Sequence, residues 1–386
     1  GRPDDSTTRA TSGCRDRELN GVRILVDLLG FTGLRGGTET YARELLPRLP
    51  RLLPGIEFAA LTGRAGTEHV REFFPGRVHT LGWVGAGPAS WAAGAIVATD
   101  TFARRNGADL VWAPANFGPI VHGVPRVVTV HDAIYDEVPG SRRERAQRAA
   151  TSWLMTRSAR TADLVLTVSH AAAASIHNLL GVPDDRIRIA HNGSEAPRPV
   201  ADPWAAIADL RIPRDRSVLL STGSRLPHKN LEGLLDALSR IHPKDRPVSV
   251  IAGSKLPDPL APEVTRRGLD DDVILPGWVT RDQLEALYQV AAVYVCPSRA
   301  EGFGLPVLDA LRRGVPVIAS DIPVLREVGG GVASYVPVGE PRSLADAIQR
   351  TLGTPWDTDN REAALTWAAR FTWESAAQAT AQALAD

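Results

Sequence analysis

The chain has 386 residues, of which 44% are apolar and 23% are charged, and its 44 Lys and Arg balance its 44 Asp and Glu. This composition is typical of a globular protein, and the length suits two domains better than a single core. The balanced charge disfavours a nucleic-acid-binding protein, because such proteins normally carry a basic excess. It leaves room for a local basic patch that contacts anionic lipid.

Cysteine usage and apolar runs bear on the location of the protein. Cys14 lies in a polar stretch and Cys296 in an apolar run, so neither a disulfide between them nor metal-ligand spacing is expected. No window approaches the roughly 18 uninterrupted apolar residues of a membrane span. We expect a cytoplasmic location, with peripheral contact with the inner face of the membrane as an open alternative.

The first half of the chain alternates short apolar runs with helical stretches. Residues 1–20 contain almost no apolar side chains, and we expect a disordered tail there. Continuous apolar runs that alternate with helices indicate a parallel sheet covered on both faces. The runs lie at 22–26, 57–62, 109–113, 126–130 and 163–168, and helical stretches at 38–46 and 144–160.

A stiff connector divides the chain, because residues 196–203 place three prolines in eight positions. The alternation then restarts. Strands are predicted at 218–222, 248–252, 273–277, 293–297 and 315–320, and helices at 230–240, 281–290 and 306–313. We predict an α/β protein with two Rossmann-like domains, at 21–196 and 204–368, which face each other across a cleft. Ligands of such sheets bind beyond the carboxyl ends of the strands.

The segment 298–321, SRAEGFGLPVLDALRRGVPVIASD, carries the strongest functional signal. Glu301 opens a glycine-spaced loop, and Pro306 suits the first position of a helix. The amides of Phe303, Gly304 and Leu305 would then face the cleft, a site that suits a diphosphate. Asp309, one turn into the helix, has oxygens that can accept hydrogen bonds from both ribose hydroxyls.

This segment resembles the EGFGLPxLE core of glycosyltransferase family 4, with Asp309 in place of the second Glu. The resemblance covers nearly the whole chain after residue 20. It implies a GT-B fold and a retaining, metal-independent transfer from a nucleotide diphosphate-sugar, with no cofactor. It also implies that Glu301 binds hydroxyls of the donor sugar. Residues 369–386 resemble the closing helix of the family, which packs back on the first domain.

The stretch GSRLPHKN, residues 223–230, follows a predicted strand. In the family an Arg and a Lys at this strand end hold the diphosphate leaving group, and the matching residues are Arg225 and Lys229. Cleavage of the sugar–phosphate bond puts charge on the phosphate, so fixed cations there stabilise the transition state more than the ground state.

Two motifs of the first half belong to the opposite wall of the predicted cleft. Gly36 and Gly37 precede a helical pattern, and the family carries a similar run that lines the cleft, where glycines would let acceptor and phosphate approach the backbone. His131 follows the strand at 126–130. Taken alone it is more often a structural histidine, but the resemblance implies contact with the donor sugar.

The combination of motifs looks most like the mannosyltransferase branch of the family, which suggests mannose from GDP-mannose, with a UDP-hexose as the nearest alternative donor. The acceptor would be a glycan, a lipid-linked sugar or a small molecule. Two other classes stay open, namely a nucleotide-sugar epimerase and a catalytically silent sugar-nucleotide-binding protein. The sequence leaves the oligomeric state undecided.

Overall fold

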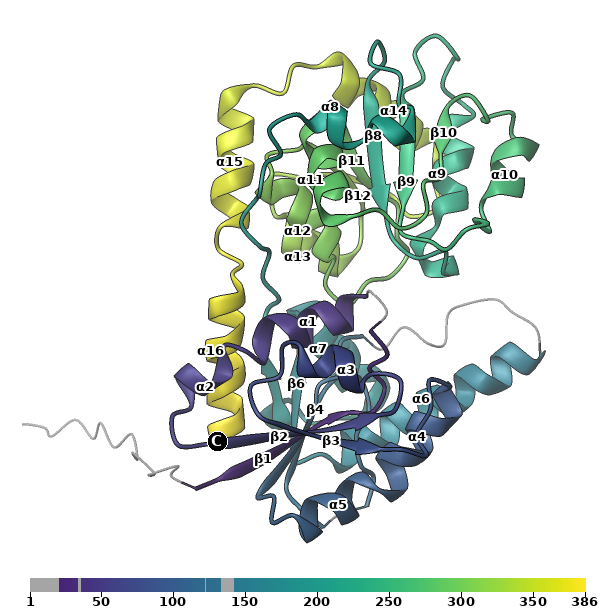
Figure 1. Ribbon diagram of the computed structural model, residues 1–386. Helices are drawn as coiled ribbons and strands as arrows, with labels where there is room; N and C mark the ends of the chain where they lie inside the picture. The colour runs from purple at the N-terminus through teal and green to yellow at the C-terminus, as the bar shows by residue number, and fades with distance from the viewer. Residues whose placement is uncertain (1–20, 34–35, 122, 133–141) are drawn as a thin grey trace, which may run out of the picture.

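A computed structural model describes residues 21–33, 36–121, 123–132 and 142–386. Within these ranges the chain forms two parallel α/β domains, one above the other in Figure 1. The tail predicted at 1–20, with Cys14, lies outside the described residues. In the described part of the chain, no helix is both long and apolar enough to cross a membrane.

The first domain is built on a seven-stranded sheet of order β3-β2-β1-β4-β5-β6-β7. All neighbouring pairs are parallel, and β1 is buried along nearly its whole length, as expected for a central strand covered on both faces. The strands are β1 (Arg23–Leu28), β2 (Glu57–Gly63), β3 (Arg77–Leu81), β4 (Leu110–Ala113), β5 (Arg126–Thr129), β6 (Leu164–Thr167) and β7 (Ile187–Ile189).

The second domain repeats the architecture with a six-stranded parallel sheet of order β10-β9-β8-β11-β12-β13. Its core packs apolar strand residues against helices α9, α12 and α14. The strands are β8 (Val218–Thr222), β9 (Val248–Ala252), β10 (Val273–Ile274), β11 (Ala291–Cys296), β12 (Val317–Ser320) and β13 (Ser334–Val336).

Helices connect the strands in both domains. Several begin at side-chain caps: Ser169 Oγ accepts a hydrogen bond from the amide of Ala172, and Thr280 with Gln283 forms a capping box. The first-domain helices are α1 (Gly37–Leu45), α2 (Leu49–Leu52), α3 (Thr67–Arg71), α4 (Pro88–Val97), α5 (Thr99–Arg105), α6 (Arg142–Thr161) and α7 (His170–Ser175). Those that follow are α8 (Pro203–Ala206), α9 (Leu231–Leu238), α10 (Ala261–Arg266), α11 (Arg281–Val290), α12 (Leu305–Arg312), α13 (Pro323–Gly329), α14 (Pro341–Gly353), α15 (Thr358–Ala368) and α16 (Trp373–Ala385).

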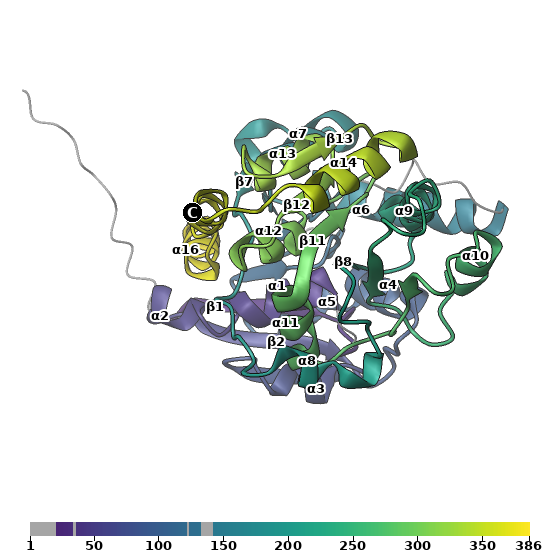
Figure 2. The same cartoon turned by 90° about the horizontal axis from the view of Figure 1, so that it is seen from above.

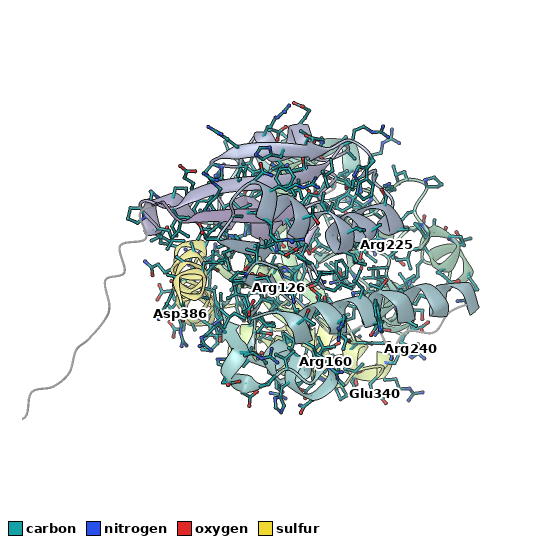
Figure 3. The ribbon with its side chains drawn as sticks, turned by 90° about the horizontal axis from the view of Figure 1, so that it is seen from below. Arg126, Arg160, Arg225, Arg240, Glu340 and Asp386 are labelled. Atoms are coloured by element: carbon teal, nitrogen blue, oxygen red, sulfur yellow. The ribbon has the colours of Figure 1, made fainter. Side chains whose placement is uncertain are left out.

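The chain crosses between the domains twice, after β7 and between α15 and α16. We call residues 190–196 the first crossover. Beyond the second crossing, α16 packs against α1, α2 and β6 of the first domain, and Figures 1 and 2 show it alongside α2. The carboxylate of Asp386, labelled in Figure 3, lies 3.9 Å from the guanidinium of Arg188 on β7. The C-terminal helix therefore belongs to the core of the first domain, although the sequence before it builds the second.

Four strands differ from the expectation. The strand predicted at 273–277 ends at Ile274, because Pro276 cannot donate to the ladder and Gly277 has a left-handed φ of 75°. Strands β3, β7 and β13 were not predicted. Each is a short strand at the edge of its sheet with at least one exposed side chain, and none has a continuous apolar run in its sequence.

Candidate functional site

A pocket of about 870 Å³ lies between the two domains. The first domain contributes the start of α1, residues 131–132 directly after β5 and residues of the first crossover. The second domain contributes the loops that follow β8, β9 and β11. Because most of these segments leave the carboxyl ends of parallel strands, the pocket lies where such sheets place ligands.

The loop after β11 leads directly into α12, as the sequence predicted. Gly304 has a φ of 94°, a left-handed conformation that glycine adopts without strain, and the helix begins at Leu305 with Pro306 in its first turn. Phe303, Gly304 and Leu305 all line the pocket. The N-terminus of α12, with its unpaired amides and positive dipole end, is therefore exposed to whatever the pocket binds.

Gly302 packs directly against the backbone of the first domain. A Cβ at this position would lie 2.3 Å from the backbone oxygen of His131, so no other residue fits without a shift of the backbone. The hydroxyl of Ser169 also donates to the Gly302 carbonyl at 2.9 Å. The loop that carries Glu301 is thus held against the first domain from two directions.

Lys229 and Glu301 form an ion pair at the pocket wall. The Lys229 Nζ lies 2.7 and 2.8 Å from the two Glu301 carboxylate oxygens, and Ser298 Oγ donates to Oε1 at 2.7 Å. Burial alone would lower the pKa of Lys229, but the charge and hydrogen bonds of Glu301 outweigh it, and this pKa is raised. Burial lowers the pKa of the neighbouring His228, and the charge of Lys229 lowers it further. Of these two neighbouring groups, Lys229 is therefore the one that carries a positive charge at neutral pH.

Arg225 does not take the predicted position. Its guanidinium donates to both oxygens of Asp258, at 2.9 and 2.7 Å, and to the carbonyls of Gly223 and Ile251, each at 2.8 Å. Among the described residues that line the pocket, Ser224 is present and Arg225 is absent. The expectation that Arg225 faces the cleft is wrong. Asp258 lies in the loop after the neighbouring strand β9, and nothing in the local sequence signals that it binds Arg225.

His131 lines the pocket from the first domain, as predicted. Its Nε2 is 2.8 Å from the carbonyl oxygen of Pro114. Because a carbonyl only accepts, Nε2 carries the proton in the neutral ring and Nδ1 is the acceptor. Burial lowers the pKa of His131 to about 4, so the ring is neutral at pH 7. Residues 133–139, a little further along the chain, lie outside the described residues.

Gly36 and Gly37 line the pocket at the start of α1. Gly36 has an extended φ of −177°, which any residue adopts, and a Cβ on either glycine would meet no described atom within 4 Å. The described residues around them therefore do not require glycine at either position. A close approach by a ligand is a physical reason that would account for the pair.

Asp309 lines the pocket from α12, as predicted. Its Oδ1 accepts a hydrogen bond from Ser194 Oγ at 2.5 Å and lies 3.8 Å from Arg313 Nη1. Burial raises the pKa of Asp309, whereas Arg313 and Ser194 oppose the rise. Arg313 in turn binds Glu285, with Nε 2.8 Å from Oε2. Sequence analysis missed Ser194 because it lies 115 positions from Asp309 along the chain.

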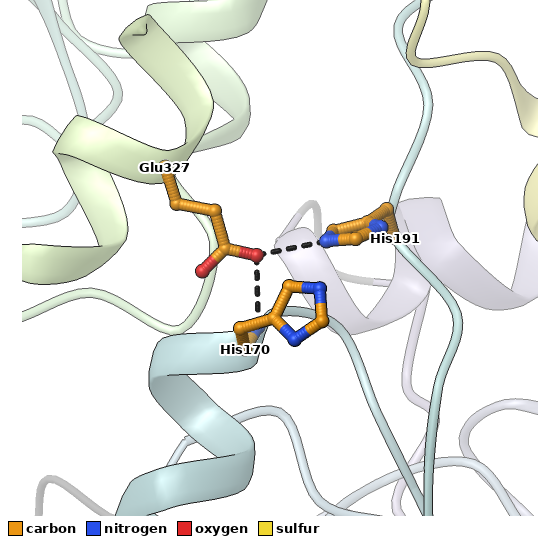
Figure 4. A group of neighbouring side chains, drawn as sticks. All are labelled: His170, His191 and Glu327. Atoms are coloured by element: carbon orange, nitrogen blue, oxygen red, sulfur yellow. Dashed lines mark hydrogen bonds and ion pairs between the residues drawn. The ribbon is translucent and has the colours of Figure 1, made fainter.

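Glu327 on α13 holds the second domain against the first (Figure 4). Its carboxylate accepts from the amides of His170 and Ala171, at 2.8 and 3.0 Å, and from His191 Nε2 at 2.8 Å. His170, His191 and Glu327 are also the described group whose ligand atoms, all within 4.8 Å of one another, could hold a metal ion. A metal ion would displace hydrogen bonds that both Glu327 oxygens already accept. In this structure the group therefore joins the two domains through hydrogen bonds.

Two family models match the two domains. Residues 35–196 match the model of Glycosyltransferase Family 4, and residues 202–366 match that of Glycosyl transferases group 1. The boundary between the matches falls in the proline-rich connector. Together the matches cover both sheets and the pocket between them, apart from the first strand.

Curated relatives match over shorter segments. The O-antigen chain mannosyltransferase B of Escherichia coli is 33% identical over 135 residues, which cover 30% of this chain and 35% of that protein. The GDP-mannose:cellobiosyl-diphosphopolyprenol alpha-mannosyltransferase of Xanthomonas oryzae is 36% identical over 118 residues, which cover 29% of this chain and 30% of that protein. The match therefore spans about a third of the length of these relatives.

Solved structures match over almost the entire chain. Sucrose-phosphate synthase from Thermosynechococcus elongatus superposes with a TM-score of 0.74 at 22% identity, over 94% of this chain and 98% of that one. Alr3699/HepE from Anabaena, in complex with UDP-glucose, superposes with a TM-score of 0.73 at 20% identity, over 94% and 99%. At these identities the likeness establishes the fold, which is GT-B, as predicted.

Proposed function

This chain belongs to glycosyltransferase family 4, on its mannosyltransferase-like branch, and we propose that it transfers a hexose from a nucleotide diphosphate-sugar to an acceptor hydroxyl. One observation carries the proposal: Lys229 and Glu301 meet in the interdomain pocket beside the N-terminus of α12. A cation and a helix N-terminus suit a diphosphate, and a carboxylate suits sugar hydroxyls.

The first candidate donor is GDP-mannose, because curated relatives are named as mannosyltransferases and one is named for that donor. A UDP-hexose is the second candidate, because the structure of Alr3699/HepE holds UDP-glucose. The acceptor is proposed to be a glycan, a lipid-linked sugar or a small molecule. The name of the Xanthomonas relative, which includes a diphosphopolyprenol, favours the lipid-linked class.

The proposed reaction retains the configuration of the sugar. The acceptor oxygen forms a bond to the anomeric carbon on the face from which the diphosphate departs. The bond between that carbon and the phosphate oxygen breaks, and the departing oxygen takes the acceptor proton. Products are a glycoside and a nucleoside diphosphate, so atoms and charge balance without a base from the protein.

We assign a role in that reaction to the predicted site residues that line the pocket. Lys229 and the amides at 303–305 stabilise charge on the departing phosphate without a metal ion. Glu301 positions the sugar through its hydroxyls. His131, neutral with Nδ1 as an acceptor, would receive a hydrogen bond from a sugar hydroxyl. Arg225 is assigned no contact with the ligand, because its donors bind Asp258 and two carbonyls.

Donor consumption tests the proposal. The full chain would be incubated with GDP-mannose, UDP-glucose and UDP-galactose, each with and without a panel of polyprenyl-diphosphate glycans, with and without EDTA. We expect nucleoside diphosphate release from one donor, dependent on the acceptor and insensitive to EDTA, and an anomeric configuration in the product equal to that of the donor. Acceptor-independent release with formation of an epimeric sugar would indicate an epimerase. Donor binding without turnover across the panel would indicate a silent binding protein.

A further inference from the structure

The first crossover contacts Asp309 through Ser194. Ser194 Oγ donates to Oδ1 of Asp309 at 2.5 Å, while the Asp309 side chain remains 32% exposed and lines the pocket. Ser194 itself is buried, and it is absent from the described residues that line the pocket. A ligand in the pocket can therefore contact the Asp309 carboxylate directly. It does not contact Ser194, which can affect the ligand only through its hydrogen bond to Asp309.

The crossover holds Ser194 in place. Its amide donates to the carbonyl of Phe371 at 3.2 Å, which ties the first crossover to the second. A Cβ on the preceding Gly193 would lie 2.1 Å from the amide nitrogen of Trp373, so the two segments are packed backbone to backbone. Ser194 is thus a fixed donor rather than a side chain on a free loop.

When a fixed donor binds one oxygen of a carboxylate, it also sets the direction in which the other oxygen points. With Oδ1 engaged by Ser194, and Arg313 near it, Oδ2 has lone pairs left for a ligand. An Asp carboxylate lies one methylene closer to α12 than a Glu carboxylate would, so its reach is short. We propose that Ser194 positions the Asp309 carboxylate for the ribose hydroxyls of the donor nucleotide, an inference that rests on the proposed function.

Unlike Ser194, the residues on either side of it in the first crossover line the pocket. Asn192 lines the pocket, and its buried Oδ1 has no hydrogen-bond partner among the described residues. Glu195 lines it as well and forms an ion pair with Arg281, at the start of α11. A segment that connects the domains therefore supplies the pocket with polar groups, and Ser194 acts within that set as a positioning residue.

Equilibrium binding of ribose-modified nucleotides tests this role. Calorimetry would compare GDP and UDP with their 2′,3′-dideoxy forms on the wild-type chain, Ser194→Ala, and the pair Ser194→Ala with Asp309→Glu. We expect Ser194→Ala to weaken the ribonucleotide on the order of 10-fold, the size of one hydrogen bond to a charged group, and to leave the dideoxy form nearly unchanged. The double variant should regain most of the lost affinity, because the longer Glu reaches ribose without the serine.

The controls separate positioning from a general structural effect. Thermal melting would report whether each variant is folded, and Ser194→Cys would replace Ser194→Ala if the alanine variant were not. Equal weakening of the ribo and dideoxy forms, or no change in either, would overturn the role of Ser194 while nucleotide binding stands. A folded wild-type chain that binds neither GDP nor UDP would instead overturn the proposed function, and this inference with it.

Discussion

The two walls of the pocket are built differently. The wall from the second domain carries cations that are paired with carboxylates, Lys229 with Glu301 and Arg313 with Glu285. The wall from the first domain presents Gly36, Gly37, Thr38, Thr40, Asp132 and the neutral His131, with no Lys or Arg among its described residues. Positive charge that can hold a diphosphate is therefore concentrated on one side, and the other side offers backbone, hydroxyl groups, a carboxylate and a neutral ring.

The difference indicates how the work of the site is divided. A donor nucleotide with two phosphates needs fixed positive charge, and a partly buried cation such as Lys229 needs a paired anion to hold that charge in place. Acceptors differ in shape, and the glycines at the start of α1 leave room for them. We infer that the second domain determines donor binding and that the first domain determines which acceptor hydroxyl can approach.

Removal of the cation gives the largest expected effect. Lys229→Ala should lower kcat/KM for transfer by roughly 10²–10³-fold, because charge on the departing phosphate loses its fixed partner. Steady-state kinetics with the donor identified by the donor-consumption assay would measure the loss. Lys229→Arg is the matched control, since it keeps the charge in a different geometry and should lose less. Activity within twofold of wild type in Lys229→Ala would contradict the division between the walls.

Arg225 gives the contrasting case in the same domain, because its removal should lower the stability of the fold and should not lower kcat as the removal of Lys229 does. Arg225→Ala leaves Asp258, whose side chain is 2% exposed, without its guanidinium partner, and should lower the free energy of unfolding by about 3 kcal/mol. Urea denaturation would measure the loss. The pair Arg225→Met with Asp258→Leu should recover most of it. A loss of kcat equal to that of Lys229→Ala, with stability unchanged, would return Arg225 to the site.

Arg225 also marks the limit of what the sequence predicts here. The alternating architecture and the start of α12 follow from local patterns, because strand runs and turn residues are contiguous in sequence. The place of Lys229 in the same pocket as Glu301 and Asp309 was implied by the resemblance to glycosyltransferase family 4 and not by a local pattern. The direction in which Arg225 points depends on Asp258, 33 positions away. The partner of Asp309 lies 115 positions away on the crossover. Such contacts are set by tertiary packing, and a single sequence carries no local signal for them.

The first-domain wall can be tested through the pH dependence of His131. Its pKa is about 4 in the folded chain against 6.5 as the ordinary value, so between these pH values the unfolded chain binds a proton that the folded chain does not. Stability therefore falls as pH is lowered through this range, by about 1.4 kcal/mol per pH unit. From pH 6.5 to 5, wild type should lose about 2 kcal/mol more than His131→Gln. Urea denaturation of both proteins at both pH values measures the difference, and parallel losses would show that the ring is not held neutral.

The smallest effect on stability is expected at the open glycines. Gly37→Ala adds a methyl group that meets no described atom, at the first residue of α1, so the free energy of unfolding should stay equal or rise by up to about 1 kcal/mol. Gly302→Ala is the contrast, because its Cβ would meet the His131 carbonyl, and it should lose about 1–3 kcal/mol. If a substrate approaches the backbone at Gly37, transfer in Gly37→Ala should still fall roughly 10-fold or more, because a misplaced substrate reacts slowly. Unchanged transfer in that stable variant would mean that no substrate contacts the backbone there, and the acceptor would have to enter along another part of the first-domain wall.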